Sequence, residues 1–179
     1  MFKSGVGFLA LFGLGWWLLA TSTFGSSARL IAMVAGCAAA IGLMLAARRF
    51  LPASAGDSFP AALRRRFLQV NGIQWLLILA VAQVCARTGT AGLIPPLVAV
   101  IVGLHFLPLA AMFEQPRLHV PAVLLTAAGV AGVAVWLLNG PDPVVRLVVG
   151  LVSALSLWGM AVWTVTEAAS SAAVHVVRE

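Results

Sequence analysis

The stretch Gly92-Leu-Ile-Pro-Pro-Leu-Val-Ala-Val-Ile-Val-Gly-Leu-His-Phe-Leu-Pro-Leu-Ala-Ala-Met-Phe113 contains no Asp, Glu, Lys or Arg over 22 positions. A helix of about 20 mostly apolar residues is long enough to cross the hydrocarbon core of a bilayer. A strand of a membrane barrel would instead alternate apolar and polar residues over about 10 positions. Because this run is continuous and helix-length, it predicts a transmembrane helix.

Five further runs of the same kind fill most of the 179-residue chain. The composition agrees, with 62% hydrophobic and 9% charged residues and a mean hydropathy of +1.07. We therefore expect an all-α polytopic membrane protein, a six-helix bundle in which residues 1–179 form a single transmembrane domain without a soluble domain. The six predicted spans are Gly5–Phe24, Ala28–Phe50, Phe67–Ala86, Gly92–Phe113, Pro121–Leu138 and Val144–Thr166.

Positive charges fall unequally on the two sides of these spans. One side carries Lys3, Arg48, Arg49, Arg64, Arg65, Arg66, Arg117 and Arg178, and the other carries Arg29, Arg87 and Arg146. The positive-inside rule therefore predicts that both termini lie in the cytoplasm. We expect the cluster formed by Arg48, Arg49, Arg64, Arg65 and Arg66 to orient the protein and to contact anionic lipid headgroups. Although the net charge is +6, this placement at the bilayer argues against nucleic acid as a partner.

One titratable side chain lies deep in a predicted span. His105 is followed three residues later by Pro108. Proline has no N–H to donate to the carbonyl of Leu104, so it loosens that turn of the helix. Ionisable residues within the membrane are costly and point to function, so His105 and Pro108 are candidate site residues.

The preceding span offers polar partners. Asn71 and Gln74 lie one helical turn apart on the same face. Gln74 is roughly 10 Å from the cytoplasmic end of its helix near Phe67, and His105 is roughly 12 Å from its own cytoplasmic end. We therefore predict a contact between Gln74 and His105. It could serve as interhelical glue, as a solute site, or in proton sensing by His105.

Tryptophans in the middle of spans strengthen the solute hypothesis. Trp16, Trp17 and Trp158 lie near the middle of the first and sixth spans, at a depth similar to that of Gln74 and His105. Trp75 is a further candidate, although it also suits the interfacial belt in which membrane tryptophans are enriched. A mixed aromatic and polar cavity would suit a neutral or weakly polar small molecule. Bulky core packing is the alternative role for these rings.

Chemistry of other kinds is not expected. His105 has no His, Cys or carboxylate partner at ligand spacing, so no metal site is predicted. The sequence contains no nucleophile elbow, no phosphate-cradling loop and no paired carboxylates. We therefore expect neither an enzyme nor a cofactor.

The segments Val70-Asn71…Gln74 and Ile101–Ala110 together resemble a pattern in small bacterial membrane proteins. In those proteins a helix with the pattern F--VN--Q precedes a helix with the pattern IVGLHF-PLA. The resemblance covers the third and fourth spans, and departs at the start of the pattern, where Phe67 stands three residues before Val70 and Gln69 intervenes. It implies a six-helix protein of the bacterial cytoplasmic membrane and draws attention to Asn71, Gln74, His105 and Pro108. It implies no activity, because that family has none to transfer.

Three functions remain open. The first is binding or passage of a small neutral or aromatic solute through a pocket near Gln74 and His105. The second is a non-catalytic structural or accessory subunit that packs through small-residue faces such as Ala32-Gly36-Ala40 and Ala128-Gly132, including homo-oligomerisation. The third is a channel gated by protonation of His105, with an activity that changes between pH 5 and 8.

Overall fold

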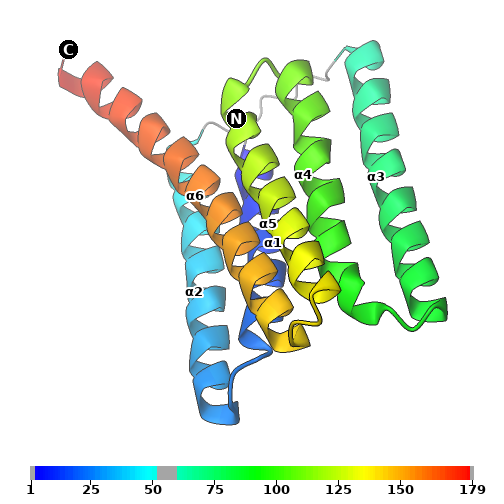
Figure 1. Cartoon of the computed structure of the whole chain (residues 1–179). Coiled ribbons are helices and arrows are strands. Elements are labelled where there is room, and N and C mark those ends of the chain that lie inside the picture. Colours follow the sequence, from blue (N-terminus) through cyan, green and yellow to red (C-terminus); the bar gives the residue numbers. More distant parts are fainter. Residues whose placement is uncertain (1–2, 52–59, 178–179) are drawn as a thin grey trace. The chain divides into compact units, whose positions relative to one another are not determined.

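Each predicted span corresponds to a helix in the computed structural model, which describes residues 3–51 and 60–177 and the side chains of residues 5–51 and 60–170. Two short 3-10 turns, η1 (Ala91–Leu93) and η2 (Pro116–Leu118), precede α4 and α5. No strand occurs among the described residues, so the predicted all-α class is confirmed. The helices, shown in Figure 1, are α1 (Lys3–Thr21), α2 (Ser26–Phe50), α3 (Ala61–Arg87), α4 (Ile94–Met112), α5 (His119–Leu137) and α6 (Asp142–Val177).

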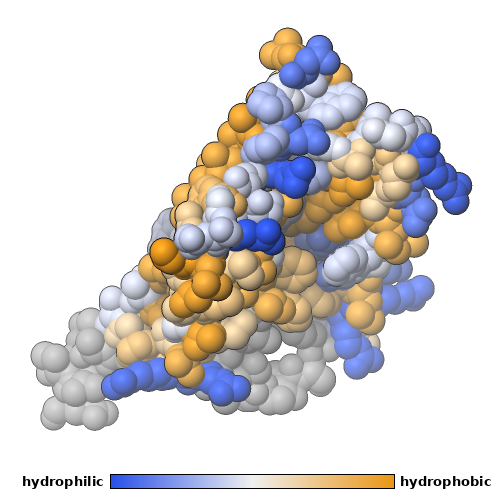
Figure 2. Space-filling view, turned by 90° about the horizontal axis from the view of Figure 1, so that it is seen from below, coloured by the Kyte–Doolittle hydropathy of each residue, from blue (hydrophilic) through white to orange (hydrophobic). Residues whose placement is uncertain are grey.

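The helices carry the surface of a membrane protein. Five of them, α2 to α6, are long and apolar enough to cross a bilayer, and α1 is a shorter apolar helix over Gly5–Thr21. On the face seen in Figure 2, apolar side chains cover much of the surface and hydrophilic residues lie in separate patches. A surface of this kind is compatible with an integral membrane protein, because lipid tails solvate it as well as a protein core does.

The described helices gather into two compact units. Unit 1 contains α1, α2 and the part of α6 from Ala154 onward, and unit 2 contains α3, α4, α5 and the part of α6 up to Ser153. The candidate polar residues of α3 and α4 thus belong to unit 2. The candidate tryptophans of α1 and α6 belong to unit 1.

In unit 1, α2 packs on α1 through small residues. Gly36, Ala40 and Ala47 are the buried residues of α2, and they lie on one helical face. The predicted small-residue face is therefore a packing surface at Gly36 and Ala40. Residues without bulk at these positions let a neighbouring helix approach closely, which replaces the hydrophobic driving force that is missing in lipid.

In unit 2, α4 and α5 are packed backbone to backbone. A Cβ atom added at Gly129 would lie 2.5 Å from the carbonyl oxygen of Pro96, and one added at Gly103 would lie 2.6 Å from the backbone nitrogen of Thr126. Neither backbone could accommodate that atom without moving. Glycine at these two positions is therefore what allows α4 and α5 to approach this closely.

Three helices of unit 2 end in the same way. After α3, α4 and α5, the residues Gly89, Glu114 and Asn139 have φ angles of 72°, 50° and 57°. The next residue then donates its N–H to a carbonyl in the last turn, as Gln115 does to Ala110 at 2.9 Å. This is the Schellman motif, which satisfies carbonyls that the helix end would leave free.

The observed helices differ in length from the predicted spans. α3 begins at Ala61 rather than Phe67, and α6 continues to Val177 rather than ending at Thr166. α1 ends at Thr21. There the hydroxyls of Thr21, Ser22 and Thr23 donate hydrogen bonds to backbone carbonyls near the end of the helix. The length of an apolar run reflects the thickness of the hydrocarbon core of a bilayer. A helix can extend beyond that run into polar surroundings, because its backbone hydrogen bonds do not depend on apolar side chains. Arg178 and the side chain of Lys3 lie outside the described residues.

Candidate functional site

The register of α3 against α4 is set by one aromatic contact. The ring centroids of Phe67 and Phe113 lie 6.0 Å apart in an edge-to-face arrangement. The two helices are antiparallel sequence neighbours, so each step forward from Phe67 matches a step back from Phe113. Gln74 is therefore level with Phe106. His105 precedes Phe106, so its height along the helix axis differs from that of Gln74 by about 1.5 Å. The depth match predicted between Gln74 and His105 follows from this register.

Gln74 differs from the other glutamines of its helix. Most of α3 is exposed, with 6% of its apolar window buried, and its buried residues are Gln74 and Cys85. Gln69 and Gln83 are both exposed, whereas Gln74 is 8% exposed. α3 packs on α4 and η1, and Gln74 lies on the same helical face as Phe67 and Cys85. We call the contact between these two helices the α3–α4 seam.

On α4, His105 lies near a proline within the helix. His105 is half-buried, and Pro108 lies inside α4. Because Pro108 has no N–H, the carbonyl of Leu104 loses its usual donor four residues later. An imidazole and an acceptor without its helical donor thus occupy adjacent positions of α4.

The polar groups of the seam are not joined to one another. Asn71 donates its amide Nδ2 to the carbonyl of Phe67 on its own helix at 2.8 Å. Within the described residues, neither the side-chain amide of Gln74 nor the ring of His105 makes a hydrogen bond to the rest of the chain. The predicted contact between Gln74 and His105 is therefore not made by a hydrogen bond between their side chains in the described structure.

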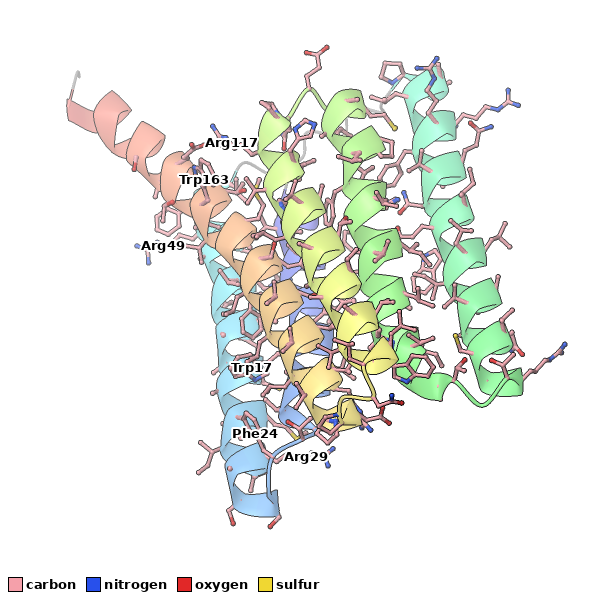
Figure 3. All side chains as sticks on the ribbon, viewed as in Figure 1. Trp17, Phe24, Arg29, Arg49, Arg117 and Trp163 are labelled. Atoms are coloured by element: carbon pink, nitrogen blue, oxygen red, sulfur yellow. The ribbon has the colours of Figure 1, made fainter. Side chains whose placement is uncertain are left out.

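In unit 1, Trp17 joins α1 to α2. Its indole Nε1 donates to the carbonyl of Ala32 at 2.7 Å. The five-membered part of its ring fills the place that a Cβ atom at Gly36 would take. Trp17 therefore lies in a notch of α2, beside the small-residue face that the sequence predicted (Figure 3).

Trp158 makes the equivalent contact between α6 and α1. Its Nε1 donates to the carbonyl of Ala10 at 3.1 Å, and its ring lies 2.5 Å from where a Cβ atom at Gly13 would be. The rings of Trp17 and Trp158 have centroids 5.4 Å apart. The indole N–H groups of Trp17 and Trp158 thus both donate to carbonyls of neighbouring helices.

The other two candidate tryptophans differ in exposure, since Trp16 is buried and Trp75 is 52% exposed. A role of any of the four tryptophans in solute binding stays a prediction.

Two further features were missed from the sequence. A surface recess of about 310 Å³ is lined by Trp136, Leu137, Asn139 and Gly140, at the turn between α5 and α6. The buried hydroxyls of Ser153 and Ser156 on α6 have no hydrogen-bond partner within the described residues. The dipeptide Asn139-Gly140 is a sequence signal for a turn, but nothing in the sequence distinguishes these serines from other small residues of a packed span.

The arginines predicted to meet lipid headgroups are exposed in both units. Arg48 and Arg49 end α2, and Arg64, Arg65 and Arg66 follow the start of α3. The guanidinium of Arg49 lies 5.6 Å from the ring centroid of Phe50. Figure 3 shows Arg49 and Arg29 toward opposite ends of α2. Charge thus gathers at the ends of the apolar helices, where the lipid phosphates of a bilayer would lie.

Among the described residues there is no group of three or more His, Cys, Asp or Glu side chains that could hold a metal ion. Compared with known proteins, the chain matches no family model, no curated protein and no solved structure.

Proposed function

We propose that this protein crosses the membrane six times, with both termini in the cytoplasm, and binds or passes a small neutral or aromatic solute at the α3–α4 seam. The observation that carries the proposal is the burial of Gln74 in an otherwise exposed helix. In the apolar part of a bilayer, a side-chain amide that lacks a hydrogen-bond partner costs free energy, even where it is not fully buried by protein. A solute that bonds to Gln74 would recover that cost.

The groups at the seam favour an uncharged ligand. The amide of Gln74 can donate and accept, the ring of His105 can do either, and the carbonyl of Leu104 can accept. No carboxylate is found in the described part of α3 or α4, so no group there would balance a cation. The buried ring of Phe106, level with Gln74, supplies an apolar wall against which an aromatic solute could lie.

The test is solute flux through reconstituted protein. Proteoliposomes are exposed to a step in the concentration of urea or glycerol, and the rate of volume change is followed by light scattering. Saturation-transfer NMR with benzyl alcohol tests binding of an aromatic probe. We expect Gln74→Leu and His105→Leu to lower flux or binding at least tenfold, since each removes a polar contact in a dry site.

Gln83→Leu is the matched control, because Gln83 lies on the same helix but is exposed. It should leave flux and binding unchanged. Equal flux and equal binding for wild-type protein, Gln74→Leu and His105→Leu would overturn the proposal.

A structural or accessory role is the alternative, and the tryptophan contacts of unit 1 favour it. Trp17 and Trp158 fill glycine notches and use their N–H groups within the protein, so they act as packing residues there. An accessory protein would show no flux of any probe, and would co-purify with a partner or with a second copy. A flux that changes between pH 5 and 8 and is abolished by His105→Gln would instead support gating by His105.

A further inference from the structure

We propose that the start of α3 is a binding site for the phosphate groups of an anionic phospholipid. Arg64, Arg65 and Arg66 are consecutive and all exposed. At about 100° per residue, three successive side chains cover roughly 200° of the helix circumference. The site is separate from the α3–α4 seam and depends on the membrane crossing of α3, not on the solute proposal.

Within the described part of the chain, the charge of these arginines is not balanced by an acidic side chain. The first turn of α3 contains no acidic residue, and none of the three arginines forms an ion pair with another residue in the described part of the chain. Guanidinium groups bind phosphate in a planar, bidentate arrangement. Uncompensated guanidinium groups at this density therefore match a phosphate-bearing ligand.

The residues that follow favour a lipid over a free phosphate. Directly after the arginines and Phe67, Leu68 is 63% exposed. The exposed surface thus changes from basic to apolar within one helical turn. A phospholipid has the same order, with its phosphate above its acyl chains, and it can occupy both surfaces at once.

The number of charges favours a headgroup with more than one phosphate. Three arginines can pair with two phosphodiesters, whereas the opposite end of the same helix carries Arg87. Arg87 thus provides the matched comparison, an exposed arginine at the other membrane border without neighbouring basic residues.

The experiment is a lipid titration of the purified full-length chain in detergent, read by native mass spectrometry. In a micelle the protein has no inside or outside, so the assay separates lipid binding from the role of arginines in orienting the chain. The probes are cardiolipin with two phosphates, phosphatidylglycerol with one, zwitterionic phosphatidylcholine, and inorganic pyrophosphate. We expect cardiolipin to bind most tightly, then phosphatidylglycerol, with phosphatidylcholine and pyrophosphate far weaker.

Each arginine near an anionic surface contributes about fivefold in affinity. The triple variant Arg64→Gln, Arg65→Gln, Arg66→Gln should therefore bind cardiolipin about a hundredfold more weakly, whereas Arg87→Gln should bind it as the wild type does. If the triple glutamine variant does not insert, the corresponding triple lysine variant keeps the charge. That variant should still prefer cardiolipin over phosphatidylcholine.

Three results would overturn the lipid site. They are unchanged cardiolipin binding in the triple glutamine variant, equal binding of cardiolipin and phosphatidylcholine to either the wild type or the triple lysine variant, and pyrophosphate binding as tight as that of cardiolipin. The variant Gln74→Leu should leave lipid binding unchanged, so failure at the seam and failure at the arginines can be told apart.

Discussion

The indole ring of Trp158 lies where a side chain at Gly13 would be, with ring atoms 2.5 Å from that position. The ring is held there because its Nε1 also donates to the carbonyl of Ala10, less than one turn away. Trp17 repeats the arrangement on α2, with Gly36 as the notch and Ala32 as the acceptor. Within unit 1, a tryptophan from one helix thus fits a glycine and a carbonyl of the next.

The first prediction concerns the glycine of this notch. Gly13→Ala places a methyl group where the rigid ring of Trp158 lies, so we expect it to destabilise the protein by about 1–3 kcal/mol. Gly15→Ala on the same helix meets nothing within 4 Å and should be neutral or stabilising by up to about 1 kcal/mol. Unfolding by SDS in mixed micelles measures both. Equal stability of the two variants would contradict the notch.

The second prediction concerns the hydrogen bond of Trp17. Trp17→Phe keeps an aromatic ring but removes the N–H that reaches Ala32 at 2.7 Å. We expect a loss of about 0.5–1.5 kcal/mol in the free energy of unfolding. Trp75→Phe is the control, since Trp75 is 52% exposed, and it should change stability by less than about 0.5 kcal/mol. An effect of Trp17→Phe no larger than that of Trp75→Phe would contradict a stabilising role of the Trp17 hydrogen bond.

The third prediction concerns the helix ends of unit 2. Glu114 has a φ of 50° after α4, a conformation that costs a residue with a Cβ atom about 1–2 kcal/mol. Glu114→Gly should therefore stabilise the protein by about 0.5–1 kcal/mol, even though it shortens a side chain. Gly89, with a φ of 72°, ends α3 in the same way, so Gly89→Ala should have the opposite sign. Thermal unfolding in detergent gives both signs, and a destabilised Glu114→Gly variant would count against this assignment.

The fourth prediction separates solute binding from interhelical glue at the seam. The side chain of Gln74 is 8% exposed as a whole and makes no hydrogen bond within the described residues. Gln74→Leu should therefore raise stability by about 1 kcal/mol while lowering flux of the probes. If Gln74 were glue, the same variant would lower stability. The exposed Gln83 serves again as control, since Gln83→Leu should change neither measurement.

Part of the candidate site could be read from the sequence and part could not. The depth of Gln74 and His105 follows from residue counting, because every helix rises by the same 1.5 Å per residue. Whether a polar side chain of α3 faces α4 or lipid depends on the rotation of the helix about its axis. The sequence does not reveal that rotation, because α3 has apolar residues on every face. The structure alone separates Gln74, which is buried, from Gln69 and Gln83, which are exposed.

By itself, the sequence determined that the chain is helical, where its apolar helices lie, and that positive charge gathers at Arg48, Arg49 and Arg64–Arg66. Those properties depend on composition over about 20 residues. Because an unpaired backbone group in lipid is costly, each continuous apolar run of that length forms a helix, which pairs its own backbone groups. Only the tertiary structure decided that Gly13 and Gly36 receive tryptophan rings and that Gly103 and Gly129 join two backbones. A glycine in an apolar helix looks the same in sequence wherever it lies, because what distinguishes these positions is the atom on the neighbouring helix.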